Sequence, residues 1–357
     1  MRRTSPTATA ATILAGSLLT VATRAAATST VLTVDQNGAK GAYATVQAAV
    51  DAAPKNSRRP VTIVVGKGTY HEVVSVPADQ PNLHLIGATG DPADVVITYD
   101  NSAGTPKPGG GTYGTEGSAT VTIAANGFLA DGITFENAFD EQAHASQDGH
   151  QAVALRTLAD RISFYHSRFL GNQDTLYLDA ANKTDIDRVY VRDSYVAGDV
   201  DFIFGPATAV FDHSTIDALD RGSTDTNGFI TAASTQLANK HGFLFTGSTF
   251  VSNAKAKTFY LGRPWHHLGD PLAIAQVTVR DSSLAAHIKD QPWTDMAGWS
   301  WAAARFGEYH NTGPGAGVSL FRPQLTDAEA EAATPAGYLS GTDRWKPWTH
   351  HRADPHA

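Results

Sequence analysis

The chain has 357 residues, 27 Lys and Arg against 35 Asp and Glu, a formal net charge of −8 and no cysteine. This length exceeds that of the usual compact domain, so we expect either two domains or one elongated domain. The acidic balance disfavours nucleic-acid binding, which needs a basic surface. The missing cysteine excludes disulfides and a lipid anchor on an N-terminal cysteine, so stability must come from burial.

The N-terminal stretch has the pattern of a secretory signal. Arg2 and Arg3 precede an uncharged run rich in Ala, Leu and Val, and three alanines end it at a favourable cleavage site. Its removal takes away three arginines and no acid, which moves the net charge from −8 to −11. We therefore expect 1–27 to be a signal peptide and 28–357 to be one secreted, extracellular domain. No later stretch is long and apolar enough to anchor it in a membrane.

Helical periodicity is scarce and lies near the two ends of the chain. Residues 45–53 predict one short helix, stopped by Pro54. Thr326-Asp327-Ala328-Glu329 is a capping box that opens another helix, which we expect to end before Pro335. Between them, the glycine-rich stretch 108–117 is interpreted as a mobile loop or as the border of a ligand groove.

Six segments between these helices share one template: an alternating apolar strand, a polar or glycine turn, then another apolar position. Repeats built from short strands without crossover helices predict a solenoid of stacked β-coils, which the terminal helices would cap. A β-sandwich would show more hairpin turns of the Asn-Gly type. The segments are 131–135, 165–169, 192–196, 212–216, 246–250 and 280–284, and their last residues are 34, 27, 20, 34 and 34 positions apart.

The stretch from Gly198 to Gly205 places two carboxylates among Val, Ile and Phe. In an extended strand, side chains two positions apart leave the same face, so Asp199 and Asp201 start as an equivalent pair. Charge in such surroundings is costly unless it is paired, and catalytic acids with perturbed pKa values occur in such places. The alternative, a strand end with both carboxylates solvated, stays open on these eight residues alone.

Three further segments put a polar group into an otherwise apolar strand. They are 151–155 with Gln151, 171–177 with Gln173 and Asp174, and 261–265 with Arg263. Stacked coils can bring such residues together although they are distant in the sequence. Taken singly, each has a structural interpretation: a glutamine within a strand, an aspartate in a turn, an arginine in a surface ion pair.

Taken together, these segments resemble the pectinesterase family, carbohydrate esterases that remove methyl groups from pectin. The similarity extends in the expected order to 68–72, 133–137 and 308–316, and so covers nearly the whole mature chain. The resemblance implies a right-handed parallel β-helix that hydrolyses the C6 methyl esters of galacturonate units and releases methanol. It implies no cofactor or metal, with methyl-esterified pectin as the partner, and nothing in an acidic, capped β-helix calls for more than a monomer.

The resemblance also implies roles for five residues. Asp201 would be the nucleophile that forms an acyl-enzyme anhydride, and Arg263 would orient it and lower its pKa. Asp174 would be the general acid and then the base, kept protonated by its neighbouring carboxylate and apolar surroundings. Gln151 and Gln173 would form a neutral oxyanion hole. Asp199 then returns to a structural role.

A groove for the sugar chain is expected around these residues. Family positions and residue types point to Trp265, Tyr177 and Phe202 as aromatic walls and to Thr115 and Met296 as further groove residues. After Trp265 the chain continues with two histidines and Leu268, where a polar groove residue is expected. The preference for methylated or free flanking sugars is therefore left open, and the histidines are interpreted as solvated rather than as metal ligands.

Other functions remain to be weighed. A serine esterase lacks its Gly-x-Ser-x-Gly elbow here. A polygalacturonase would use carboxylates to hydrolyse the glycosidic bond, and a lyase would gather Ca²⁺ with oxygen ligands. An acyl thioesterase would be expected to lose the aromatic groove and carry a lipid anchor. A carbohydrate-binding solenoid would have no need for two glutamines beside two aspartates and an arginine.

Overall fold

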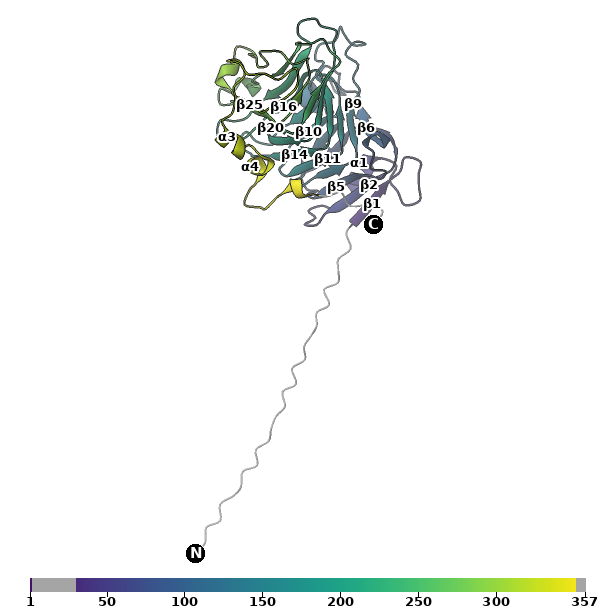
Figure 1. Cartoon of the computed structure of the whole chain (residues 1–357). Helices are drawn as coiled ribbons and strands as arrows, with labels where there is room; N and C mark the ends of the chain where they lie inside the picture. Colours follow the sequence, from purple (N-terminus) through teal and green to yellow (C-terminus); the bar gives the residue numbers. More distant parts are fainter. Residues whose placement is uncertain (2–29, 351–357) are drawn as a thin grey trace.

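The computed structural model describes Met1 and residues 30–350, in which the strands coil into a right-handed parallel β-helix (Figure 1). The predicted signal peptide therefore lies outside the described residues, apart from Met1. Every strand pairing within the three sheets is parallel, and each coil contributes one strand to each sheet over most of the helix. The solenoid predicted from the repeats is confirmed.

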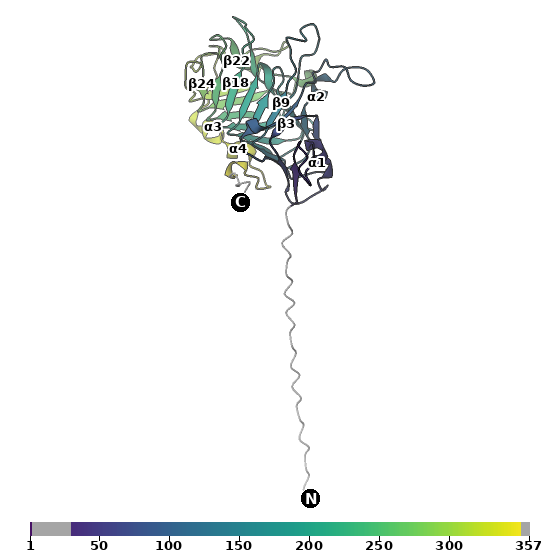
Figure 2. The ribbon, with the colours of Figure 1, turned by 90° about the vertical axis from the view of Figure 1, so that its right-hand side faces the viewer.

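The three sheets are named by their number of strands. The ten-stranded sheet contains β1 (Thr30–Val34), β2 (Val61–Val65), β5 (Leu83–Gly87), β8 (Leu129–Asp131), β11 (Ile162–Tyr165), β14 (Arg188–Arg192), β17 (Thr208–Asp212), β20 (Phe243–Thr246), β23 (Gln276–Arg280) and β25 (Arg305–Tyr309). The eight-stranded sheet, part of which Figure 2 labels, contains β3 (Gly68–His71), β6 (Val95–Tyr99), β9 (Thr134–Asn137), β12 (Arg168–Leu170), β15 (Tyr195–Gly198), β18 (Thr215–Ala218), β21 (Thr249–Val251) and β24 (Ser283–Leu284). The seven-stranded sheet contains β4 (Val74–Val76), β7 (Val121–Ile123), β10 (Leu155–Thr157), β13 (Leu176–Leu178), β16 (Val200–Gly205), β19 (Gly228–Ala233) and β22 (Phe259–Gly262).

The inside of the coil is filled by the core, to which most strands contribute every second side chain. Strand alternation explains this, because successive side chains leave opposite faces. On β13, for example, Leu176 and Leu178 join the core while Tyr177 between them faces outward. Stacked phenylalanines such as Phe211 and Phe245, with ring centroids 4.6 Å apart, continue from coil to coil. Such burial stabilises the fold by roughly 2 kcal/mol for each large side chain.

The six repeats predicted from the sequence are the turns that join the ten-stranded sheet to the eight-stranded sheet. The second residue of each template has a positive φ, between 44° and 69°, which explains why it is Gly, His or Asp. From the second repeat onward a serine follows. The backbone N–H of each of the first four serines donates to the next serine's Oγ, at 3.1 to 3.3 Å, and that of the last donates to Asn311 Oδ1 at 3.1 Å. We call these residues the serine ladder: Ser167, Ser194, Ser214, Ser248 and Ser282.

The helices lie at the two ends of the described chain and in one loop. They are α1 (Val46–Ala52), α2 (Gly114–Gly117), α3 (Asp327–Ala332) and α4 (Pro335–Leu339), with short 3₁₀ turns η1 (Pro92–Asp94), η2 (His267–Gly269), η3 (Trp301–Ala303) and η4 (Pro347–Thr349). The helix expected over 45–53 is α1, which Thr45 caps, and Val46, Ala49 and Val50 of α1 complete the core at the N-terminal end.

The C-terminal helices lie differently from a simple end cap. The predicted capping box opens α3, which ends before Pro335 as expected. Pro335 then starts α4, a helix that the sequence did not reveal, because proline is favoured in the first turn. Tyr338 and Leu339 of α4 pack on outward side chains of the ten-stranded sheet, so this helix covers a flank of the coil.

Candidate active site

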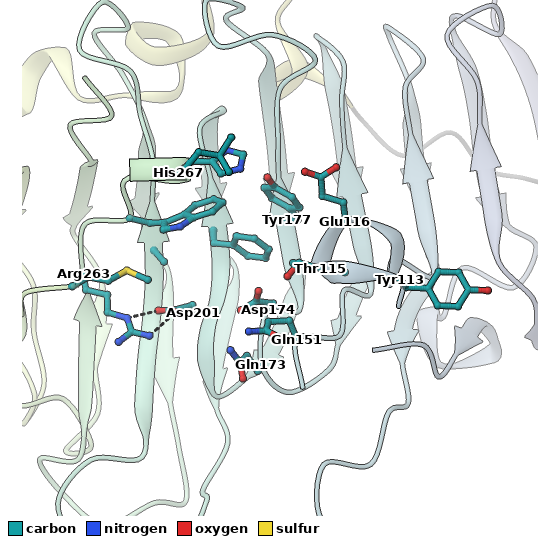
Figure 3. A pocket seen from close by; sticks show the side chains of 16 residues that line it. Tyr113, Thr115, Glu116, Gln151, Gln173, Asp174, Tyr177, Asp201, Arg263 and His267 are labelled. Atoms are coloured by element: carbon teal, nitrogen blue, oxygen red, sulfur yellow. Dashed lines mark hydrogen bonds and ion pairs between the residues drawn. The ribbon is translucent and has the colours of Figure 1, made fainter. Parts of the chain in front are cut away.

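The five residues assigned to catalysis lie together on the outer face of the seven-stranded sheet (Figure 3). They come from four coils, with Gln173 and Asp174 adjacent before β13, and they meet because neighbouring coils stack in parallel register. They line a cavity of about 720 Å³. Its lining comprises Tyr113, Gly114, Thr115, Glu116, Gln151, Gln173, Asp174, Tyr177, Asp201, Phe204, Ala232, Arg263, Trp265, His267, Leu268 and Met296.

Asp201 sits at a break in strand pairing. Between Val200 and Ile203, β16 has one residue more than its partner β19, which is a β-bulge. Asp201 takes up this extra length with a φ of 50°, a conformation that aspartate tolerates better than most residues. Bulges redirect side chains, and this one holds a 6%-exposed carboxylate at the edge of the cavity.

Arg263 binds the Asp201 carboxylate through two nitrogen atoms of its guanidinium. Its Nε lies 2.8 Å from Oδ1 and its Nη2 lies 2.6 Å from Oδ2. The guanidinium also lies 3.7 Å from the ring centroid of Phe229, which stacks in turn on Tyr260. A bidentate pair with one face covered by an aromatic ring leaves Asp201 a single orientation.

Asp174 lies just before β13, on the coil that precedes that of Asp201 in the chain. It is 8% exposed, has a φ of 65°, and its backbone N–H donates to the Val200 carbonyl at 3.0 Å. Both carboxylates of the site therefore occupy the left-handed region. Strained backbone of this kind persists only where neighbouring segments hold it, and it clusters at functional sites.

The two carboxylates differ in how strongly they hold a proton. Burial raises the pKa of Asp201, and the bonds from Arg263 counter that rise. The expectation that Arg263 lowers the pKa thus describes its contribution correctly, but burial is the larger effect. Burial raises the pKa of Asp174 well above its ordinary value, and the negative charge of Asp201 adds to that rise. Of the two carboxyl groups, Asp174 therefore holds its proton the more strongly.

Gln151 and Gln173 lie side by side, on neighbouring coils of the seven-stranded sheet. The Ala152 N–H donates to the Gln173 carbonyl at 3.1 Å, which fixes the two backbones relative to each other. Within residues 30–350, neither side-chain amide is hydrogen-bonded to another protein group. Figure 3 shows both amides beside Asp174. Two amides that point into the cavity with their donors unused are suited to stabilise an oxyanion.

The floor of the groove is aromatic. Tyr177 and Phe204 stack with centroids 4.2 Å apart, and Trp265 meets both edge-on, at 6.1 and 5.7 Å. Trp265 and Tyr177 therefore line the cavity, as expected from the sequence. Arg156 covers the far side of the Tyr177 ring and is itself paired with Asp179.

Phe202 is the exception, and its assignment to the groove was wrong. Its side chain is fully buried in the core of the coil. The bulge at Asp201 changes the alternation, so that both Phe202 and Ile203 point inward and Phe204 reaches the groove. Strict alternation counted from Asp201 does not reveal Phe204, because only the register shift makes it face outward.

Gly198, which ends β15, and Gly205, which ends β16, are required by close packing. A Cβ on Gly198 would lie 2.3 Å from the Cβ of Phe202, and one on Gly205 would lie 2.1 Å from the Leu178 carbonyl oxygen. Gly205 also has a φ of 122°, which side chains rarely permit. The glycines therefore let the bulged strand pack tightly against its neighbours.

Loops form the rim of the groove. Thr115 lies on α2 within the glycine-rich stretch, so this stretch borders the groove, which was one of its two interpretations. Met296 begins a tight turn that ends at Trp299, and it lines the cavity as expected. The sequence did not single out Glu116 or Tyr113, because these rim residues come from loops without the coil pattern.

The histidines after Trp265 belong to this rim. His267 stacks on Trp265 with centroids 4.5 Å apart, and His266 stacks on Trp299 at 3.8 Å. Leu268 is 87% exposed at the edge of the cavity. Among the described residues, no group of three or more His, Asp or Glu side chains is arranged to hold a metal ion. Nor does any helix in residues 30–350 have the length and apolarity to cross a membrane.

Asp199 lies away from the groove. It is 3% exposed and lines a second cavity of about 410 Å³, together with Glu141 and Arg221. The Arg221 Nε lies 3.4 Å from its Oδ2. The two aspartates of the octapeptide are therefore not equivalent, because the left-handed backbone at Asp201 separates their directions.

Comparison with known proteins places this geometry in a family. The sequence model described as Pectinesterase matches residues 31–342. A pectinesterase of Ralstonia solanacearum is 37% identical over 310 residues, which cover 77% of each chain. Pectinesterase A of Dickeya dadantii is 33% identical and covers 85% of this chain and 88% of its own.

Solved structures agree with this match. The pectin methylesterase PemA from Erwinia chrysanthemi superposes with a TM-score of 0.82 at 33% identity, covering 90% of this chain and 99% of that one. The matches span nearly all of the coil and the whole groove, and they concern both sequence and architecture. The chain therefore belongs to the pectinesterase family and is a carboxylic ester hydrolase that acts on the methyl esters of pectin.

Proposed function

We propose that hydrolysis proceeds through an acyl-enzyme on Asp201. An Oδ of Asp201 attacks the C6 carbonyl carbon of a methylated galacturonate, and the side-chain amides of Gln151 and Gln173 stabilise the tetrahedral oxyanion. The bond from C6 to the methoxyl oxygen then breaks. Asp174 gives its proton to the departing oxygen, so methanol leaves and an anhydride joins Asp201 to the sugar.

The second half of the reaction reverses the role of Asp174. Its carboxylate, now ionised, takes a proton from a water molecule that attacks C6 of the anhydride. The bond to Asp201 breaks, the product leaves as a free galacturonate, and Asp174 is protonated again. The observation that carries this proposal is the bidentate pair of Asp201 with Arg263 beside a carboxyl group whose pKa is raised well above its ordinary value.

The substrate that fits this site is a methyl-esterified stretch of homogalacturonan. Tyr177, Phe204 and Trp265 give the groove an aromatic floor beside the reacting groups, on which the apolar faces of sugar rings can pack. A solved pectin methylesterase that is 33% identical, with a TM-score of 0.82, is described in complex with a hexasaccharide. That likeness supports binding of several consecutive sugars in the present groove.

The assay that tests this function uses highly methylated pectin and follows three products at once. We expect release of methanol, without new reducing ends and without an unsaturated product that absorbs in the ultraviolet. New reducing ends would indicate a polygalacturonase, and an absorbing product would indicate a lyase. Binding of pectin with none of the three products would indicate a carbohydrate-binding solenoid.

We further propose that residues 1–27 direct export and that the mature enzyme is an extracellular monomer. The charged start, apolar run and small-residue cleavage site support export. Expression of the full chain in a secreting host tests this. The expected result is a monomeric protein in the medium whose N-terminus lies near residue 28, whereas intact chains retained in the cell would contradict it.

A further inference from the structure

A cluster of three charged residues lies behind the segment that carries Gln173 and Asp174. It consists of Glu141, Asp199 and Arg221, with Arg221 placed 3.4 Å from Asp199 and 3.8 Å from Glu141. Glu141 and Asp199 are both largely buried, whereas the side chain of Arg221 is 45% exposed. With both acids ionised, the cluster carries one net negative charge, and the mechanism described above makes no use of it.

The cluster is connected to the active site through the backbone. Glu141 Oε1 accepts the N–H of Gln173 at 3.3 Å, and the N–H of Asp199 donates to the Asn172 carbonyl at 3.3 Å. Asn172 lines the second cavity, while Gln173 and Asp174 line the active-site cavity. The short segment 172–174 thus forms the wall between the two cavities, with the charged cluster on one side and the substrate on the other.

The charges that surround Asp174 come from two sides. Asp201 and Arg263 face it from the groove, and Asp199 and Glu141 face it from behind. Burial is the largest cause of its raised pKa, and Asp201, Asp199 and Glu141 add to the rise while Arg263 opposes it. Burial and Glu141 raise the pKa of Asp199 itself to about 6. Asp199 is therefore ionised in the alkaline range, where Asp174 is at risk of losing its proton.

We propose that Glu141, Asp199 and Arg221 act as a positioning unit for the general acid: Glu141 holds the backbone of Gln173, and the negative charge of the unit keeps the proton on Asp174. The inference rests on the role proposed above for Asp174. It gives Asp199 a function in the known reaction, although its side chain does not reach the groove. Arg221 partly offsets the influence of the two acids on Asp174, because its positive charge favours the ionised form of nearby carboxyl groups.

The test is the pH dependence of kcat/KM for methanol release, measured for the wild type and three charge variants. Loss of a negative charge makes ionisation of Asp174 easier, so Glu141→Gln and Asp199→Asn should move the alkaline limb to lower pH, by about half a unit. Loss of the positive charge in Arg221→Met should move it to higher pH by a similar amount. A limb that stays in place, or that moves in the same direction in all three variants, would overturn the proposal.

Further variants separate positioning from charge and test the underlying mechanism. Glu141→Gln keeps an oxygen that can accept the Gln173 N–H, whereas Glu141→Ala removes it, so only the alanine variant should also lose about tenfold in kcat. Equal kcat values in these two variants would refute the positioning role. Asp174→Asn tests the general acid itself: turnover that survives this change would refute the proposed mechanism. Loss of turnover there, with unmoved limbs in the charge variants, would refute only the present inference.

Discussion

The turns of the serine ladder and the active-site groove both place non-glycine residues in the left-handed backbone region, but in different ways. In the ladder, residues such as His166, Asp193 and His213 adopt this conformation at the same point of successive coils. In the groove, Asp174 and Asp201 adopt it once each, Asp174 just before β13 begins and Asp201 where the pairing of β16 with β19 is interrupted. The repeated turn is part of the scaffold, whereas the isolated left-handed residues direct a carboxylate side chain toward the groove. Matched substitutions in the two regions test this distinction.

The largest difference in methanol release is expected between Asp201→Asn and Asp193→Asn, the matched substitution in a ladder turn. Asparagine tolerates the same backbone conformation and keeps the shape of the side chain, but it removes the proposed nucleophile. Methanol release by Asp201→Asn should fall by about three orders of magnitude or more. Asp193→Asn should retain the wild-type rate, and thermal unfolding should show that both variants fold. Turnover above a few percent in Asp201→Asn would show that the nucleophile is wrongly assigned.

A smaller loss is expected for the amide donors. Gln173→Ala or Gln151→Ala should lower kcat by about 10²- to 10³-fold, since each removes one donor to the oxyanion. The KM should change much less, because the donors act in the transition state. Steady-state kinetics on methylated pectin measures both quantities. A change confined to KM would instead indicate a role in substrate binding.

Arg263→Met is expected to shift the acid limb of the pH profile. The reaction needs ionised Asp201, so activity falls as the pH drops through the pKa of this group. Burial already raises this pKa and Arg263 counters the rise, so removal of the guanidinium raises it further. The acid limb should therefore move to higher pH, by about one unit or more. A limb that moves to lower pH, or wild-type activity still rising well below about pH 4, would contradict an ionised nucleophile.

The smallest effect is expected in the ladder itself. Ser214→Ala leaves the buried N–H of Ser194 without its acceptor, and we expect the free energy of unfolding to fall by about 1 to 2 kcal/mol. Denaturant unfolding measures this change. Because the ladder turns are remote from the reacting groups, kcat should remain at the wild-type value. A drop in kcat without loss of stability would show that the two regions are coupled.

The sequence predicted well what repeats in the structure. The six aligned segments correspond to six successive turns, residues 45–53 contain α1, and the capping box locates the start of α3. Polar residues in apolar strands, together with the family resemblance, led to the five residues that the structure brings to one cavity. Their catalytic roles stay predictions.

What the sequence did not predict lies where the repeat is interrupted. Phe202 points inward, as alternation from Asp201 requires, whereas Phe204 reaches the groove because one extra residue in β16 changes the register, and no residue type marks a bulge of this kind. Glu141 and Glu116 reach the site from loops whose lengths vary between coils. The path of such loops depends on packing with distant segments, which local patterns do not contain.

The most direct test of the central claim is mass spectrometry of the enzyme quenched with acid during turnover of a methylated oligogalacturonide. We expect a covalent sugar adduct on the peptide that contains Asp201, present in the wild type and absent from Asp201→Asn. An adduct on another carboxylate, or only unmodified protein during active methanol release, would contradict it.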